Sequence, residues 1–161
     1  MAGVRWTARA GPRTSHPPHT LLIRGSPGGS MRPPVMTRSV ILSTAAPQPV
    51  SAYSQAIQSG QLLFLAGQIP LDPSTGKVVS GTIAEETERV IDNLRAVLSA
   101  AGATLENVVK TTVYLTNMAD FAAFNAVYAR HFTKDPPART TVAVAALPLG
   151  VRVEVEAIAA L

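Results

Sequence analysis

The sequence has no cysteine, and that absence excludes several kinds of chemistry. Without thiols the protein has no disulfide, no cysteine nucleophile and no cysteine-bound metal ion. The three histidines, His16, His19 and His131, are too few and too scattered to suggest a metal site. We therefore expect no metal ion.

Long apolar runs are also missing, since no stretch approaches the ~18 residues that a membrane-spanning helix needs. Charged residues make up only 15% of the chain and apolar residues 47%. That balance is typical of a compact globular protein, and 161 residues are enough for one domain with its own core. We expect no membrane partner.

Acidic residues are absent from the first 38 positions, which contain six arginines. The remaining chain holds eight basic and ten acidic residues, a net charge of −2, although the whole chain carries +4. A nucleic-acid-binding domain needs its basic patch on the folded part, so we expect no nucleic-acid partner. Any affinity for RNA would belong to the basic segment.

Residues 1–38 are rich in Arg, Ser, Pro and Gly and show no helical or strand period. We expect a disordered basic N-terminal extension there and a folded domain at residues 39–161. Arginine without acids also suits an organellar transit peptide, but Pro17-Pro18 and Pro33-Pro34 interrupt the amphipathic helix that such peptides form. We favour a start codon set too early, with Met36 as the working initiator. That reading implies the cytoplasm, and a genuine transit peptide would imply an organelle.

Hydrophobic periods predict the elements of the folded part. A period of two indicates strands, and Thr82 with Glu85 forms a capping box that opens a helix with one apolar stripe. Gly67 ends an apolar run, where glycine permits either a β-bulge or the close approach of a ligand. We expect strands at residues 39–43, 53–58, 62–67 and 107–116, two more after Pro137, and helices at 83–101 and about 118–132.

The order of these elements predicts an α+β fold in which two helices cover one face of a sheet of about six strands. The other face is mixed, because Lys110, Thr112 and Tyr114 alternate with apolar residues on one strand. Such a face is too apolar in places to be freely solvated. We therefore expect copies of the chain to cover it in a homo-oligomer.

Three charges interrupt the last two apolar strands. Burying an unpaired ion is unfavourable, so we expect these charges to bind a ligand or to form ion pairs. Glu154 and Glu156 occupy alternate positions and point to the same face, while Arg139 opens the preceding strand. We predict that Arg139 and a carboxylate on a neighbouring strand hold a small carboxylic acid and aim a water at it. A salt bridge from Arg139 to the next subunit is the alternative, and residue chemistry alone does not choose between Glu154 and Glu156.

Seven motifs in this order resemble the reactive intermediate deaminase (RidA, or YjgF) family, and the resemblance covers residues 39–161. They are Tyr53-Ser54-Gln55-Ala56, Ala66-Gly67-Gln68-Ile69-Pro70, Asp72-Pro73-x-Thr75-Gly76, Val109-Lys110-Thr111-Thr112-Val113, Asp120-Phe121 with Asn125, Pro137-Ala138-Arg139, and Val153-Glu154-Val155-Glu156-Ala157.

The resemblance implies a chorismate-mutase-like fold, a homotrimer with sites between subunits, and cofactor-free hydrolysis of 2-imino or enamine acids to 2-oxo acids and ammonia. Such acids are by-products of pyridoxal-phosphate enzymes that act on serine or threonine. It also implies a site in which Arg139 clamps the substrate carboxylate and Glu154 orients and deprotonates water. The remaining residues that it implies line or support that site: Tyr53, Gly67, Asn125 and Thr141.

The sequence departs from the family pattern at Ser51, Ala52, Ala66 and Thr141, which bears on substrate preference and rate. An alternative function is a non-enzymatic module of the same fold that binds small carboxylic acids or a partner protein.

Overall fold

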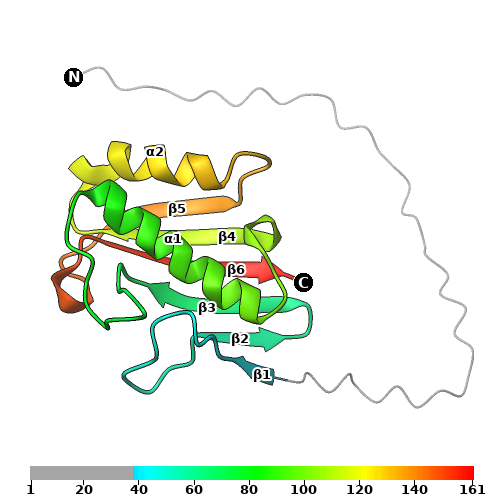
Figure 1. Ribbon diagram of the computed structural model, residues 1–161. Helices are drawn as coiled ribbons and strands as arrows, with labels where there is room; N and C mark the ends of the chain where they lie inside the picture. The colour runs from blue at the N-terminus through cyan, green and yellow to red at the C-terminus, as the bar shows by residue number, and fades with distance from the viewer. Residues whose placement is uncertain (1–37) are drawn as a thin grey trace, which may run out of the picture. The chain divides into compact units, whose positions relative to one another are not determined.

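Six strands form one mixed sheet in the order β1-β2-β3-β6-β4-β5 (Figure 1). The computed structural model describes residues 38–161, so the predicted disordered extension at residues 1–38 lies outside that range except for Arg38, which belongs to a strand. β4 and β5 are parallel and every other neighbouring pair is antiparallel. The strands are β1 (Arg38–Ile41), β2 (Ala56–Ser59), β3 (Leu62–Gln68), β4 (Val108–Leu115), β5 (Ala138–Ala143) and β6 (Val153–Ala160).

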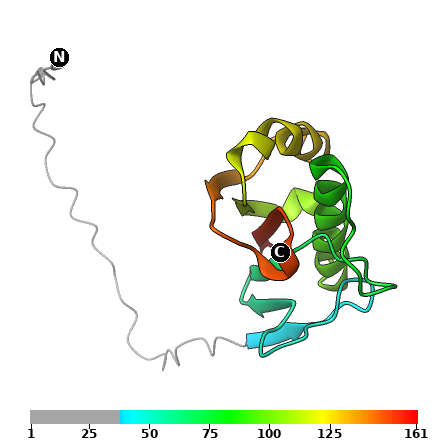
Figure 2. The ribbon, with the colours of Figure 1, turned by 90° about the vertical axis from the view of Figure 1, so that its left-hand side faces the viewer.

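Two helices, α1 (Ile83–Ala100) and α2 (Phe121–His131), lie together on one face of the sheet (Figure 2). The Thr82–Glu85 capping box is formed as predicted, with the Glu85 amide donating to the Thr82 hydroxyl at 3.3 Å. The apolar stripe of α1 packs on the strands, where Val153, Val155 and Ala157 of β6 are buried. The predicted α+β architecture, with both helices on one face, is confirmed.

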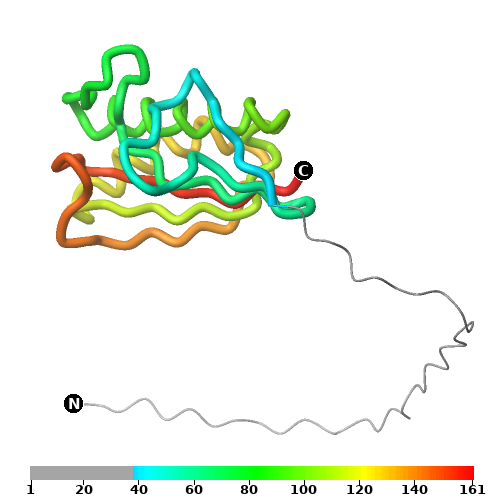
Figure 3. Tube along the Cα trace, turned by 90° about the horizontal axis from the view of Figure 1, so that it is seen from below, coloured from blue at the N-terminus to red at the C-terminus, as the bar shows by residue number. Residues whose placement is uncertain are grey.

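β6 is the last strand of the chain, yet it lies in the middle of the sheet. Figure 3 shows β6 (red), β4 (yellow-green) and β5 (orange) side by side in that order. The chain leaves β5, crosses the end of β4 through a turn at Pro148–Gly150, and enters between β3 and β4. This crossover decides where the charged side chains of the last two strands lie.

The largest differences from the predicted boundaries are at the starts of β2 and α2, each of which begins three residues later than predicted. β2 begins at Ala56 rather than at Tyr53. The Gln55 side chain binds the backbone of the preceding loop, so the residues before Ala56 belong to that loop and not to the strand. The second helix begins at Phe121, since Asn117 caps a separate 3-10 turn over Met118–Asp120.

Candidate active site

The six predicted site residues fall into two groups in the folded chain. Tyr53, Gly67 and Glu154 line one cavity of about 530 Å³. Arg139, Asn125 and Thr141 do not line it.

Glu154 of β6 lies directly against the backbone of Gly67 in β3. A β-carbon built on Gly67 would lie 1.9 Å from Glu154 Oε1 and 2.8 Å from its Cδ, so only glycine leaves room for this carboxylate. The β3–β6 pairing is shifted between Leu65 and Gln68, which is the β-bulge considered for Gly67. The close approach that glycine permits is thus made by Glu154.

Burial raises the pKa of the Glu154 carboxyl above its ordinary value, and the negative charge of Glu156 adds to this effect. Glu156 points to the same face but does not line the cavity, and it accepts a hydrogen bond from the Tyr114 hydroxyl at 3.2 Å. Geometry therefore distinguishes two carboxylates that residue chemistry left equal. A carboxyl with a raised pKa in a cavity is a candidate for proton transfer.

The loop between β1 and β2 forms one wall of the cavity, and Gln55 fixes that loop. The Gln55 side chain is 1% exposed; its Oε1 accepts from the Ser43 amide at 2.6 Å, and its Nε2 donates to the Pro47 carbonyl at 2.8 Å. Buried backbone groups need such partners. The wall that carries Tyr53 is therefore built on a buried side-chain amide.

Arg139 of β5 is held by α2. Its Nη2 donates to Asn125 Oδ1 at 2.9 Å, and its guanidinium carbon lies 4.6 Å from the ring centroid of Tyr128. The rings of Phe121 and Phe124 lie 5.6 and 5.8 Å from the same carbon. No carboxylate within residues 38–161 forms an ion pair with Arg139. The guanidinium is thus positioned by an amide and aromatic rings, and its charge is available to an anion.

The prediction that Arg139 and the carboxylate occupy neighbouring strands is wrong for the single chain, because β4 lies between β5 and β6. The two side chains also point to opposite faces. Arg139 pairs with Thr111, which faces the helices, whereas Glu154 pairs with Tyr114 on the uncovered face. The insertion of β6 beside β4 is a long-range pairing that no local pattern in the sequence reveals.

Thr141 lies two residues after Arg139 on β5, on the same face as Arg139 and opposite Val113 of β4. β5 is an edge strand that pairs only with β4. An edge strand has backbone groups with no partner strand on one side. This position is compatible with the backbone contact that the resemblance implies for Thr141.

The model of one protein family, described as Endoribonuclease L-PSP, matches residues 43–161. The chain belongs to this RidA/YjgF/L-PSP family. A mouse relative, 2-iminobutanoate/2-iminopropanoate deaminase, is 48% identical over 122 residues that cover 76% of this chain and 90% of that protein. The chloroplastic Reactive Intermediate Deaminase A of Arabidopsis thaliana is 44% identical over 77% of this chain and 66% of its own length.

Solved structures of the family share the fold of this chain. The crystal structure of E. coli TdcF with bound serine has a TM-score of 0.74 and 34% sequence identity, and the match covers 76% of this chain and 98% of the TdcF chain. The family fold therefore accounts for nearly the whole described part of this RidA-family chain.

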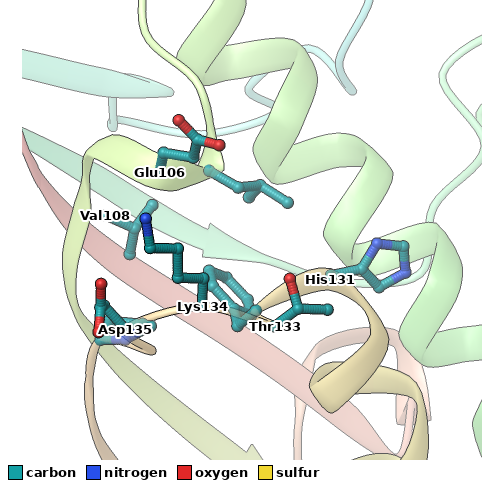
Figure 4. Close-up of a pocket in the computed structure, with 9 residues that line it drawn as sticks. Glu106, Val108, His131, Thr133, Lys134 and Asp135 are labelled. Atoms are coloured by element: carbon teal, nitrogen blue, oxygen red, sulfur yellow. The ribbon is translucent and has the colours of Figure 1, made fainter.

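Sequence reasoning missed part of the main cavity and all of a second one. Val50 and Leu149 line the main cavity from two irregular connections, where no hydrophobic period marks them. The second cavity, of about 270 Å³, is surrounded by Glu106, Lys134, Asp135 and their neighbours from loops at the other end of the domain (Figure 4). None of the predicted site residues lines it.

Residues 38–161 contain neither a cluster of metal-binding side chains nor a membrane-spanning helix. No group of three His, Cys, Asp or Glu side chains lies close enough together to hold a metal ion. No helix in that range has the length and apolar character needed to cross a membrane.

Proposed function

We propose that this protein hydrolyses 2-imino acids and their enamine tautomers to 2-oxo acids and ammonia, without a cofactor. The proposal rests on the Glu154 carboxylate. This group lies over Gly67 inside the cavity, and its pKa is raised. A mouse relative that is 48% identical bears the name 2-iminobutanoate/2-iminopropanoate deaminase, which agrees with this chemistry.

In the proposed reaction Glu154 accepts a proton from water as the water oxygen attacks C2 of the protonated imine. The carbon–nitrogen double bond becomes a single bond, and a tetrahedral amino alcohol forms. Glu154 gives its proton to the nitrogen, and the carbon–nitrogen bond then breaks. Ammonia leaves, and Glu154 takes the hydroxyl proton as the 2-oxo group forms. A raised pKa suits this exchange, because an acid–base group works best near the operating pH. The iminium carbon is already electrophilic, so positioning supplies much of the remaining rate.

Arg139 is proposed to bind the substrate carboxylate. A guanidinium presents two parallel N–H groups that match a carboxylate, and Asn125 keeps one edge of Arg139 in place. Tyr53 lines the cavity beside the reacting carbon, and backbone groups of Gly67 and Thr141 contact the substrate.

The separation of Arg139 from Glu154 requires a second copy of the chain. We propose a homotrimer in which Arg139 of one protomer reaches the Glu154 cavity of the next. The uncovered sheet face supports association, because Leu62 and Phe64 of β3 are 42% and 43% exposed there. Covering them with another copy would also complete the site.

Coupled turnover tests the activity. A threonine dehydratase supplies 2-iminobutanoate, and 2-oxo acid formation is followed with and without this protein. We expect faster release with the parent protein and none above background with Arg139→Ala or Glu154→Ala. Glu156→Gln is the matched control, since Glu156 shares the strand and face of Glu154 but lies outside the cavity. Equal loss in that control would contradict the role of Glu154.

Subunit complementation tests the shared site. Arg139→Ala and Glu154→Gln chains are co-expressed with different tags, and mixed oligomers are purified. Each mixed trimer would contain one site of three with both native residues, so the purified mixed trimers should recover about a third of the parent activity. Each variant alone stays inactive. If the mixture is also inactive, no site is shared between protomers.

The same purified protein distinguishes a non-enzymatic binding module. Such a module would bind 2-oxobutanoate in calorimetry through Arg139 and show no turnover with any imino acid. That result would replace the deaminase by the carboxylate-binding alternative.

We propose the cytoplasm as the compartment. The chloroplastic name of the Arabidopsis relative keeps an organelle as the alternative. Fluorescent fusions of residues 1–161 and 36–161 distinguish them, since a transit peptide would move only the longer fusion.

A further inference from the structure

The backbone of Leu149 is strained in a way that its own packing does not explain. Its φ of 56° and ψ of 15° lie in the left-handed region, which a bulky residue rarely adopts. The Leu149 residue is 71% exposed in the single chain, so burial does not offset this strain. Such strain at a cavity points to a contact that is made only when the cavity is filled.

Val50 is a second exposed apolar residue on the same cavity. It is 91% exposed and comes from the loop between β1 and β2, while Leu149 comes from the connection between β5 and β6. Both line the cavity that holds Glu154. We refer to Val50 and Leu149 as the apolar rim.

The side-chain amides in the cavity wall already donate hydrogen bonds to backbone carbonyls. Gln48 Nε2 donates to the Ser43 carbonyl at 2.9 Å, Gln55 Nε2 to Pro47, and Gln68 Nε2 to the Ala66 carbonyl at 3.2 Å. No lysine or arginine within residues 38–161 lines this cavity. Away from Glu154 and Tyr53 the cavity therefore offers mostly apolar surface, with Ile69, Leu71 and Pro148 beside the rim.

The cavity is also larger than the smallest 2-imino acid requires. Its volume is about 530 Å³, and 2-iminopropanoate has only six non-hydrogen atoms. With C2 of the substrate at Glu154, a longer side chain has room to extend over the apolar wall. Burial of each added methylene group is favourable.

We propose that the apolar rim selects 2-imino acids with large apolar side chains, such as those formed from leucine, over those formed from alanine. This specificity rests on the proposed deaminase activity and names the substrate class of the same cavity. The imine group and the carboxylate are recognised as described above, and Val50 and Leu149 contact the side chain.

Substitution of Leu149 by Asn tests the rim without disturbing the fold. Asn has nearly the shape of Leu, tolerates the left-handed backbone better, and replaces the apolar surface with an amide. Val50→Thr is a second isosteric variant in an exposed loop. Val40→Thr is the matched control, because Val40 is 58% exposed but lies on β1 outside the cavity.

Imino acids are generated from alanine, norvaline, leucine and glutamate by an L-amino-acid oxidase with catalase present, and 2-oxo acid formation is measured. We expect kcat/KM of the parent protein to rise with apolar side-chain size and to be low for the glutamate-derived imine. Leu149→Asn should lower kcat/KM for the leucine-derived imine by about tenfold, mainly through KM, and so reduce its ratio to kcat/KM for the alanine-derived imine. Val40→Thr should change neither.

Each other outcome has a distinct meaning. Absence of turnover of every imine by the parent protein removes the proposed function and this specificity with it. Turnover of all imines with the same ratios in parent and Leu149→Asn removes the specificity alone. If Leu149→Asn changes the oligomeric mass in light scattering and lowers all rates equally, the rim contacts another copy of the chain, and the specificity is likewise overturned.

Discussion

Glu154 Oε1 occupies the space in which a side chain at Gly67 would begin, since a β-carbon there would lie 1.9 Å away. The bulge of β3 and the carboxylate of β6 are therefore one structural unit. This relationship joins two residues that are 87 positions apart in the printed sequence.

Gly67→Ala should displace the Glu154 carboxylate and lower kcat by about a hundredfold, the scale of a lost acid–base group. Stability should change little, because the obstructing atoms belong to the end of a flexible side chain and the φ of Gly67 is not positive. Gly60→Ala is the control: it has open space around it but a φ of +60°, so it should lose about 1 kcal/mol of stability and no activity. Steady-state kinetics and thermal unfolding check both variants.

Glu154→Gln should lower kcat by about 10²–10⁴-fold. The pKa of Glu154 is raised in the folded protein, so folding disfavours its ionised form. Its contribution to stability is complete below the unfolded pKa and is lost as pH rises through the folded pKa. Glu154→Gln should therefore raise the unfolding temperature more at pH 8 than at pH 4. A gain that is larger at pH 4 would contradict the raised pKa.

The activity of the parent protein should fall on acidification with an apparent pKa above the ordinary value of a glutamate. The reason is that the carboxylate must be ionised to accept a proton from water, and burial raises its pKa. The dependence of kcat/KM on pH measures this limb. Burial is the larger cause of the raised pKa and the charge of Glu156 the smaller, so Glu156→Ala should move the limb only slightly downward. A large downward move would contradict that order.

Asn125→Asp should weaken substrate binding more than Asn125→Ala does. Asn125 Oδ1 accepts a hydrogen bond from Arg139, and a carboxylate in its place would pair with the guanidinium and compete with the substrate. We expect KM to rise about tenfold in the alanine variant and further in the aspartate variant, with smaller changes in kcat. If kcat falls and KM is unchanged in both, Arg139 does not bind the substrate carboxylate.

Gln55→Leu should destabilise the protein by about 3 kcal/mol, because the buried Ser43 amide and the part-buried Pro47 carbonyl lose the side chain that binds them. The loop that carries Tyr53 would lose its attachment, so activity per folded molecule should fall as well. Chemical denaturation and kinetics measure the two effects. A variant of parent stability would mean that water replaces these bonds.

Local features of the sequence allowed most of the fold to be predicted. The capping box at Thr82, the turn at Gly60 and the alternation of β6 depend on neighbouring residues, and they are formed as expected. The start of β2 was predicted too early, since the bonds of Gln55 reach Ser43, twelve positions away. Such a bond depends on tertiary packing rather than on a period.

The sequence by itself determined the elements, the shared face of Glu154 and Glu156, and the uncovered sheet face. Only the tertiary structure decided that β6 lies between β3 and β4, which places Arg139 and Glu154 on opposite faces and Glu154 against Gly67. Caps and periods arise from interactions within a few residues, and the sequence therefore reveals them. Strand order arises from pairings between distant segments, whose free energy depends on the whole core.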